Sequence, residues 1–448
     1  MQATWKSQLS LNRHLLIVGA ALAMLGAMIL LRESAQLQVV GYAATLFVVL
    51  FAYKLDYLHP AVAYLVPWLT ILFFSTIPIS RYAHALELPT GRALLVAMLA
   101  WLASTTLAPV VSAADGLERE RPQLEVRQGF GNAILLAFMI LYGFAALNVA
   151  VSGYVPILSL ITTGDSRYMY FGIPSVYGAF LAYANALGCL VFYAYLCGRR
   201  RIYLLLFLSI IVLHVAFVTR QNVITLAAEA FVIRFLTIRR TSRVAIVGIV
   251  VLGLLGFSLF GELRSGDIKA VIGVQPEYMW IPTSLIWMYA YSYFNVLNLD
   301  NMITQSGAPL FNGVMWETLL PSVLRGDPDP GTYLEIATMT VSSYIYPVYM
   351  DIGPVGLVIV TALFGYATTW VYRRALQRRR FVDVATYGCL FYCALLSFFS
   401  NFWLYLPVIF QLFFFRLFHA VLFIPSTGEP RPAASLALDA RQLSQSQP

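Results

Sequence analysis

Long apolar runs recur along the chain from Leu15 to Phe423, and this repetition constrains the fold more than any other feature. A helix needs about 20 predominantly apolar residues to cross the roughly 30 Å hydrocarbon core of a bilayer. A dozen runs of that length do not fit the core of one soluble domain. The sequence therefore predicts an all-α polytopic membrane protein. The twelve predicted spans are residues 15–31, 38–53, 61–80, 92–112, 130–151, 176–197, 202–219, 221–238, 244–261, 352–372, 382–400 and 403–423.

The composition leaves no room for a separate soluble domain. Hydrophobic residues make up 60% of the chain and charged residues 11%, whereas about 25% of the residues in a soluble domain are charged. We therefore expect a single integral membrane domain over residues 1–448. Within it, we expect a large outer loop at residues 262–351 and a disordered cytoplasmic tail at residues 424–448.

The basic residues predict the orientation of the spans. Lysine and arginine gather in alternate short connections, for example at residues 199–201, 239–243 and 373–380. Cytoplasmic loops carry such an excess, so we expect both termini in the cytoplasm and the first run retained as a span. The net charge of +8 then reflects topology and anionic lipid headgroups, and it does not indicate a nucleic-acid partner.

The connection at residues 262–351 interrupts the regular alternation of spans and short loops. Residues 278–299 are rich in tyrosine and tryptophan, which favour headgroup depth, so we expect a helix that lies in the membrane interface. Residues 336–350 are apolar but carry hydroxyl groups and Pro347, so we expect them to enter the membrane without crossing it. Loops of this length in compact proteins are usually functional.

Two arginines on the outer side are the best candidates for binding an anionic ligand. Arg220 lies in a tight hairpin between the seventh and eighth predicted spans, and Arg264 opens the long loop. Their planar guanidinium groups suit phosphate oxygens, and the amides that begin the eighth span add donors. We expect these two arginines to form a receptacle for a lipid-linked diphosphate. Alternatively, each arginine anchors its span in headgroups or pairs with an acid such as Glu262, which contributes little energy.

Several titratable groups are candidates for proton transfer. Glu229 lies in the middle of a predicted span, so it should face the bundle interior, either as a functional group or in a helix–helix hydrogen bond. His214 is either a general base or a buried structural imidazole. Eight acids of the outer loop are either candidate bases or solvated loop charges, and we select Glu262 and Asp351 from them as candidate bases. The eight are Glu262, Asp267, Asp300, Glu317, Asp327, Asp329, Glu335 and Asp351. For Asp351 the alternative role is a helix N-cap.

Motifs for cofactors are absent from the sequence. The four cysteines lie inside apolar runs, and no spacing of cysteine and histidine indicates a metal site. There is no Walker loop, dinucleotide fingerprint, HExxH or GxSxG motif. We therefore expect no cofactor and no metal, and any group transfer must use a substrate that is already activated.

Three segments carry a resemblance to a known family. They are Arg220-Gln221-Asn222 before the eighth span, Gly261-Glu262-Leu263-Arg264 before the long loop, and Tyr344–Leu357 leading into a span with Gly365. With the large outer loop, they resemble the bacterial O-antigen or oligosaccharide repeat-unit polymerases of the Wzy type.

The resemblance implies a GT-C-like glycosyltransferase on the periplasmic face of the bacterial inner membrane. Such enzymes join undecaprenyl-pyrophosphate-linked repeat units without nucleotide sugars, and a chain-length regulator is an implied partner. The substrate-binding residues would be Arg220, Arg264, Arg325, Asn222 and Tyr349. The proton acceptor would be Asp351, Glu262 or His214.

Two other functions remain open at this point. A flippase or transporter of lipid-linked glycan would explain Glu229, although the absence of a convincing internal repeat in the sequence counts against it. A related transferase on the outer face, such as an O-antigen ligase or a glycan acyltransferase, would share the same architecture.

Overall fold

A computed structural model describes residues 16–29, 35–107, 126–165, 167–238, 261, 267–306, 309–325, 336 and 341–424. Within these ranges the chain folds into α-helices and short 3-10 helices joined by loops, and no β-strand is present. Every predicted span except residues 244–261 coincides with a helix. That span lies outside the described residues apart from Gly261, and the tail after residue 424 lies outside them too.

The apolar runs within the described residues form helices. The first helix is Leu16–Ile29. The others are α2 Ala35–Ala52, α3 Pro60–Ser75, α4 Leu88–Leu107, α5 Phe130–Ser152, α6 Pro156–Thr163, α7 Val176–Gly198, α8 Arg201–Ala216, α9 Arg220–Thr237, α11 Ile268–Val271, α12 Thr283–Ser306, α13 Ile345–Arg378, α14 Phe381–Leu395 and α15 Leu406–Leu422. The 3-10 helices are η1 Tyr168–Tyr170, η2 Pro276–Tyr278, η3 Val314–Leu319, η4 Ser322–Leu324 and η5 Phe402–Leu404.

The length and hydropathy of these helices identify a helical membrane protein. Among the described residues, four helices are both long and apolar enough to cross a bilayer: α4, α5, α7 and α13. Six further apolar helices are shorter than the length criterion, so the predicted number of twelve crossings is not established. Several of these helices end before the predicted span does. For example, α3 ends at Ser75 and α14 at Leu395.

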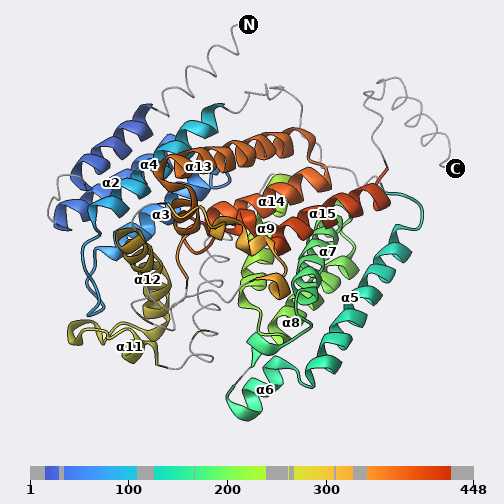
Figure 1. The fold of residues 1–448 in the computed structure, drawn as a ribbon. Helices are drawn as coiled ribbons and strands as arrows, with labels where there is room; N and C mark the ends of the chain where they lie inside the picture. Colours follow the sequence, from blue (N-terminus) through green and yellow to red (C-terminus); the bar gives the residue numbers. More distant parts are fainter. Residues whose placement is uncertain are drawn as a thin grey trace, which may run out of the picture.

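The helices form two lateral groups with a central group between them (Figure 1). On one side α2, α3 and α4 lie with α13, and on the other α5 and α8 flank α7. The helices α9, α14 and α15 lie between the two groups, because α14 packs on α9 and α15 packs on α7. Helix α9 therefore packs on α14, α7 and α8.

One end of the bundle carries most of the basic connections, and we call it the arginine-rich end. There the backbone N–H of Arg127 donates to Leu422, and the Tyr193 hydroxyl donates to the backbone oxygen of Arg379. The Tyr372 hydroxyl donates to Asp56 in the same region. The described parts of the connections predicted on the inner face thus meet at one end of the molecule.

The other end gathers the connections predicted on the outer face, and we call it the long-loop end. Its parts are joined by a hydrogen bond from Ser80 to Ile272 and by one from the amide of Tyr344 to Ser397. Here α12 packs its buried side chains against the α3–α4 connection. The predicted interfacial helix at residues 278–299 thus corresponds to α12, and protein covers much of it.

The start of α13 differs from the predicted boundary. The helix begins at Ile345, so the last part of the segment 336–350 joins α13 instead of entering the membrane separately. Gly353 has φ 68° and ψ −169°, and Pro354 follows it, which kinks the helix at this position. The first turns of α13 therefore belong to the long-loop end.

Candidate functional site

The N-terminus of α9 places Arg220 at the long-loop end. Arg220 is the first residue of α9 and is partly buried. Its Nη2 donates a hydrogen bond of 3.2 Å to the Tyr291 hydroxyl on α12, and its guanidinium lies 5.9 Å from the centre of that ring. A guanidinium held on an aromatic ring presents its donors in a defined direction.

The next two residues of α9 fix the same helix end to other helices. Gln221 Nε2 donates to the Tyr392 hydroxyl on α14 at 3.1 Å. Asn222 Oδ1 accepts from Asn185 Nδ2 on α7 at 3.0 Å. Asn222, which the sequence assigned to substrate binding, thus takes part in the contact between α7 and α9.

Four aromatic rings continue from the Arg220 contact across the long-loop end. Tyr291 lies 5.9 Å from Phe399, which lies 6.4 Å from Phe402, which in turn lies 6.1 Å from Tyr405, all measured between ring centres. We call these four residues the aromatic row. At its far end, Arg325 is close enough to interact electrostatically with the Tyr405 hydroxyl. The aromatic row therefore has an arginine beside each end.

Asn401 lies in the chain between two members of the aromatic row and was not predicted as a site residue. Its side chain is 5% exposed, and neither its Nδ2 nor its Oδ1 has a hydrogen-bond partner within the described part of the chain. The indole nitrogen of Trp403 is likewise buried without a partner there. Such groups carry a desolvation cost of about 1–3 kcal/mol.

Two of the predicted site residues, Arg264 and Glu262, lie outside the described residues. Gly261 is the last described residue before them in the sequence. An added Cβ at Gly261 would lie 2.9 Å from the Trp287 ring, so the two residues are in close contact. Trp287 stacks on Tyr291 with 5.5 Å between the ring centres. The chain therefore passes close to the Arg220–Tyr291 contact just before it reaches Glu262.

Asp351 is buried and both of its carboxylate oxygens act as acceptors. Oδ1 accepts from the backbone N–H of Gly313 at 2.7 Å, and Oδ2 accepts from that of Met315 at 3.3 Å. The residue lies inside α13, so it does not act as the N-cap. These contacts give Asp351 a positioning role for η3. The neighbouring Tyr349 packs half-buried against the main hydrophobic core.

His214 stabilises the turn that precedes Arg220. The side chain is fully buried at the end of α8, and its Nδ1 lies 3.2 Å from Thr219 Oγ1. Thr219 Oγ1 also lies 3.1 Å from the His214 backbone oxygen, to which it can donate. This arrangement fixes the residue immediately before Arg220.

Arg325 is held by two backbone oxygens in its own segment. Its Nε donates to Leu320 at 2.9 Å, and its Nη2 donates to Thr318 at 3.0 Å. Because two of its five N–H donors are engaged in this way, only the other three are available to an anion, which makes Arg325 the weaker contact.

Glu229 joins α9 to two neighbouring helices below the Arg220 site. Its carboxyl oxygens accept hydrogen bonds of 2.7 and 2.8 Å from Gln411 Nε2 on α15, and Oε2 lies 3.0 Å from Cys189 Sγ on α7. At Gly388 of α14 an added Cβ would lie 3.3 Å from Glu229 Cα. The structure therefore places Glu229 in a helix–helix hydrogen bond, one of the two alternatives raised by the sequence.

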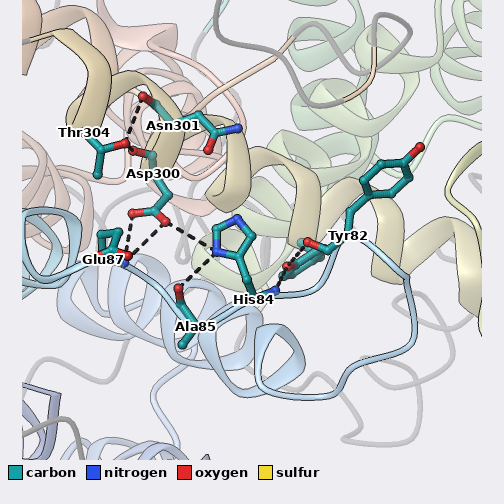
Figure 2. A network of polar contacts seen from close by, with 8 residues as sticks. Tyr82, His84, Ala85, Glu87, Asp300, Asn301 and Thr304 are labelled. Carbon is teal, nitrogen blue, oxygen red and sulfur yellow. Dashed lines mark hydrogen bonds and ion pairs between the residues drawn. The ribbon is translucent and has the colours of Figure 1, made fainter.

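A second polar cluster holds the α3–α4 connection on α12 (Figure 2). The Asp300 carboxylate is 1% exposed, accepts from the backbone N–H of Glu87 at 3.1 Å and lies 3.9 Å from His84 Nδ1. The His84 backbone N–H donates to the Tyr293 hydroxyl at 2.9 Å. Tyr293 and Tyr291 are two residues apart and so point to opposite faces of α12. This cluster is therefore separate from the Arg220 site.

Comparisons with known proteins do not assign a family. No protein-family model, curated protein or solved structure matches the chain. The functional interpretation therefore depends on the N-terminus of α9, the aromatic row and the sequence pattern.

The first prediction concerns the Glu229–Gln411 pair. Glu229→Ala removes the acceptor of a buried amide and should destabilise the protein by about 1–3 kcal/mol. The exchange Glu229→Gln with Gln411→Glu keeps one amide and one carboxyl group, so it should restore much of that loss. Thermal unfolding of the purified protein, followed by tryptophan fluorescence, measures both effects.

Glu277→Ala is the control for this experiment, because Glu277 is an exposed glutamate at the long-loop end. It should unfold like the unmodified protein. An exchange variant that unfolds at the same temperature as Glu229→Ala would show that mutual hydrogen bonding is not what holds α9.

The second prediction concerns the pH dependence of Asp300, which lies in the outer connection. Burial raises the pKa of this carboxyl group above its usual range. The folded state therefore binds the proton more tightly than the unfolded state, and this stabilisation is lost as pH rises through the raised pKa. Asp300→Asn cannot ionise and keeps one acceptor for the Glu87 amide.

The measurement is the difference in unfolding temperature between Asp300→Asn and the unmodified protein, from about pH 4 to pH 7. We expect the difference to shift in favour of the variant as pH rises. The titratable groups that face Asp300, His84 and Glu87, are present in both proteins. A difference that is constant or moves the other way would contradict the prediction.

Proposed function

We propose that the protein is a polymerase-type glycosyltransferase that joins undecaprenyl-pyrophosphate-linked oligosaccharide repeat units on the periplasmic face of the bacterial inner membrane. In this proposal the chain has twelve spans of the GT-C-like kind, both termini are cytoplasmic and the long-loop end is periplasmic. One observation carries it: Arg220 is fixed at a helix N-terminus beside an aromatic row that has a second arginine at its other end.

Arg220 suits the leaving group of this reaction. In the transfer, an acceptor hydroxyl oxygen bonds to the anomeric carbon while the bond from that carbon to the diphosphate oxygen breaks. Negative charge grows on the departing undecaprenyl pyrophosphate, and a fixed guanidinium stabilises that charge. The amides in the first turn of α9 favour an anion at the same place.

The aromatic row suits the sugar part of the substrate. The C–H faces of sugar rings are apolar and pack on aromatic side chains, while hydroxyl groups need polar partners. Asn401 offers an amide donor and an amide acceptor, both without partners within the described residues. Two lipid-linked chains held in this way would gain rate through orientation.

The proton from the acceptor hydroxyl goes to one of the three candidate bases. The contacts of Asp351 favour a positioning role, because both of its oxygens accept backbone N–H groups. In this proposal the buried His214 would accept the proton on Nε2, since its Nδ1 faces Thr219 Oγ1. Glu262 is the acid nearest in sequence to Gly261, which packs by Trp287. The variants Glu262→Gln and His214→Gln distinguish Glu262 from His214 as the group that accepts the proton.

The prediction from this proposal concerns the length of the glycan. Arg220→Ala should leave the protein in the membrane but reduce chain extension by roughly 10²–10³-fold, because a donor to the leaving group is lost. A mass-resolved glycan profile of a null strain carrying the variant should show single repeat units. Arg220→Lys should give an intermediate profile, since the ammonium keeps the charge without the planar fork.

Arg167→Ala is the matched control, because Arg167 is an exposed arginine at the same end of the molecule. It should support normal chain lengths. Normal chain lengths with Arg220→Ala would refute the proposed role. Long chains that remain on the lipid carrier in the null strain would indicate an O-antigen ligase instead, and repeat units retained on the inner leaflet would indicate a flippase.

A further inference from the structure

Residues 309–325, which we call the strap, bridge two helices at the long-loop end. At one end the backbone N–H groups of Leu310 and Phe311 donate to the backbone oxygens of Met350 and Asp351 in α13, at 2.8 and 3.2 Å. Near its other end the amide of Val323 contacts Ser175 Oγ, the residue before α7. The strap therefore runs from one lateral helix group to the other.

The middle of the strap is held down on the bundle. The Asp351 carboxylate accepts from two strap amides, as described above, and the Thr318 hydroxyl donates to the backbone oxygen of Leu404 in η5. Met315 points inward and is 4% exposed. These contacts give the strap one fixed inner face and one fixed outer face.

The outer face of the strap is apolar. Six large hydrophobic side chains are between 44% and 75% exposed: Leu310, Phe311, Trp316, Leu320, Val323 and Leu324. Soluble surfaces rarely expose so many neighbouring apolar side chains without a partner. An apolar medium or partner is therefore expected to cover this face.

The backbone of Phe311 is strained, and its ring is exposed. Its φ is 50°, in the left-handed region that bulky residues avoid, and its side chain is 75% exposed. Such a conformation costs of order 1–3 kcal/mol and persists where neighbouring contacts impose it. At Phe311 the neighbouring contact is the hydrogen bond from its backbone N–H to the backbone oxygen of Asp351.

The strap continues the exposed apolar stripe of α13. Val355, Ile359 and Leu363 are spaced by four residues, so they form one stripe along the helix, and each is at least 55% exposed. The stripe begins next to Gly353, where an added Cβ would lie 2.8 Å from Pro309 of the strap. One edge of the strap therefore adjoins a surface that faces lipid in a helical membrane protein.

The other edge of the strap adjoins a second stripe of the same kind. On α15 the exposed residues Ile409, Phe413, Leu417 and Val421 are again spaced by four. This stripe begins one turn after Leu404, to which Thr318 of the strap donates. The apolar outer face of the strap thus connects two lipid-facing helix surfaces at the end of the bundle.

We propose that the outer face of the strap inserts into the boundary between headgroups and acyl chains of the bilayer leaflet at the long-loop end. Its occupant is the phospholipid leaflet itself, because the strap is continuous with two lipid-facing stripes. Trp316 matches the preference of tryptophan for this depth, and Arg325 places a positive charge beside anionic headgroups. This inference does not depend on the proposed function.

The test is photo-crosslinking to lipid. The photoreactive residue p-benzoylphenylalanine replaces Phe311 or Val323 in the full chain, which is reconstituted into nanodiscs of phosphatidylglycerol. The same residue at position 413 on α15 is the positive control, and at the exposed Glu277 it is the negative control. Intact-protein mass spectrometry then measures the mass shift from covalently attached phospholipid.

We expect phospholipid adducts at positions 311 and 323 with a yield close to that at position 413. At position 277 we expect few or no adducts. Two strap positions are used so that a single poorly folded variant does not decide the result. Strap yields as low as at position 277, or adducts to a second copy of the chain in place of lipid, would overturn the proposal.

Discussion

The hydrogen bonds of Glu229 are the interactions on which the central part of the structure depends. One amide, from Gln411, donates to both carboxyl oxygens, and the thiol of Cys189 contacts one of them. In an apolar interior a carboxyl group needs such partners, because leaving it unpaired is costly. These contacts fix α9 among α7, α14 and α15. Since Arg220 is the first residue of α9, they also fix the position of the guanidinium at the long-loop end.

The long-loop end combines three features that seldom occur together on a water-exposed loop. A partly buried arginine lies on the ring of Tyr291, a row of aromatic rings follows it, and a strap with an apolar outer face covers the neighbouring region. If the strap reaches headgroup depth, these groups lie beside the leaflet that would hold a lipid-linked substrate. A diphosphate at that depth could reach Arg220 while its hydrocarbon tail stays in the bilayer.

The sequence predicted the helices well because hydrophobic periodicity is a local signal. It could not predict contacts between distant positions, such as the amide of Gly313 on the Asp351 carboxylate or the position of His84 beside Asp300. Asp351 and His214 were selected as candidate bases by residue type and position. The fold shows that both side chains make structural contacts: Asp351 accepts backbone N–H groups of the strap, and His214 lies beside Thr219. Asn401 was missed because a single asparagine in an aromatic stretch carries no pattern.

The most direct test of the central claim is a cryo-electron microscopy structure of the protein in lipid nanodiscs with undecaprenyl pyrophosphate. We predict density for the diphosphate within hydrogen-bonding distance of the Arg220 guanidinium, at the end of the aromatic row. Diphosphate density at the arginine-rich end, or at the long-loop end but away from Arg220, would contradict the claim.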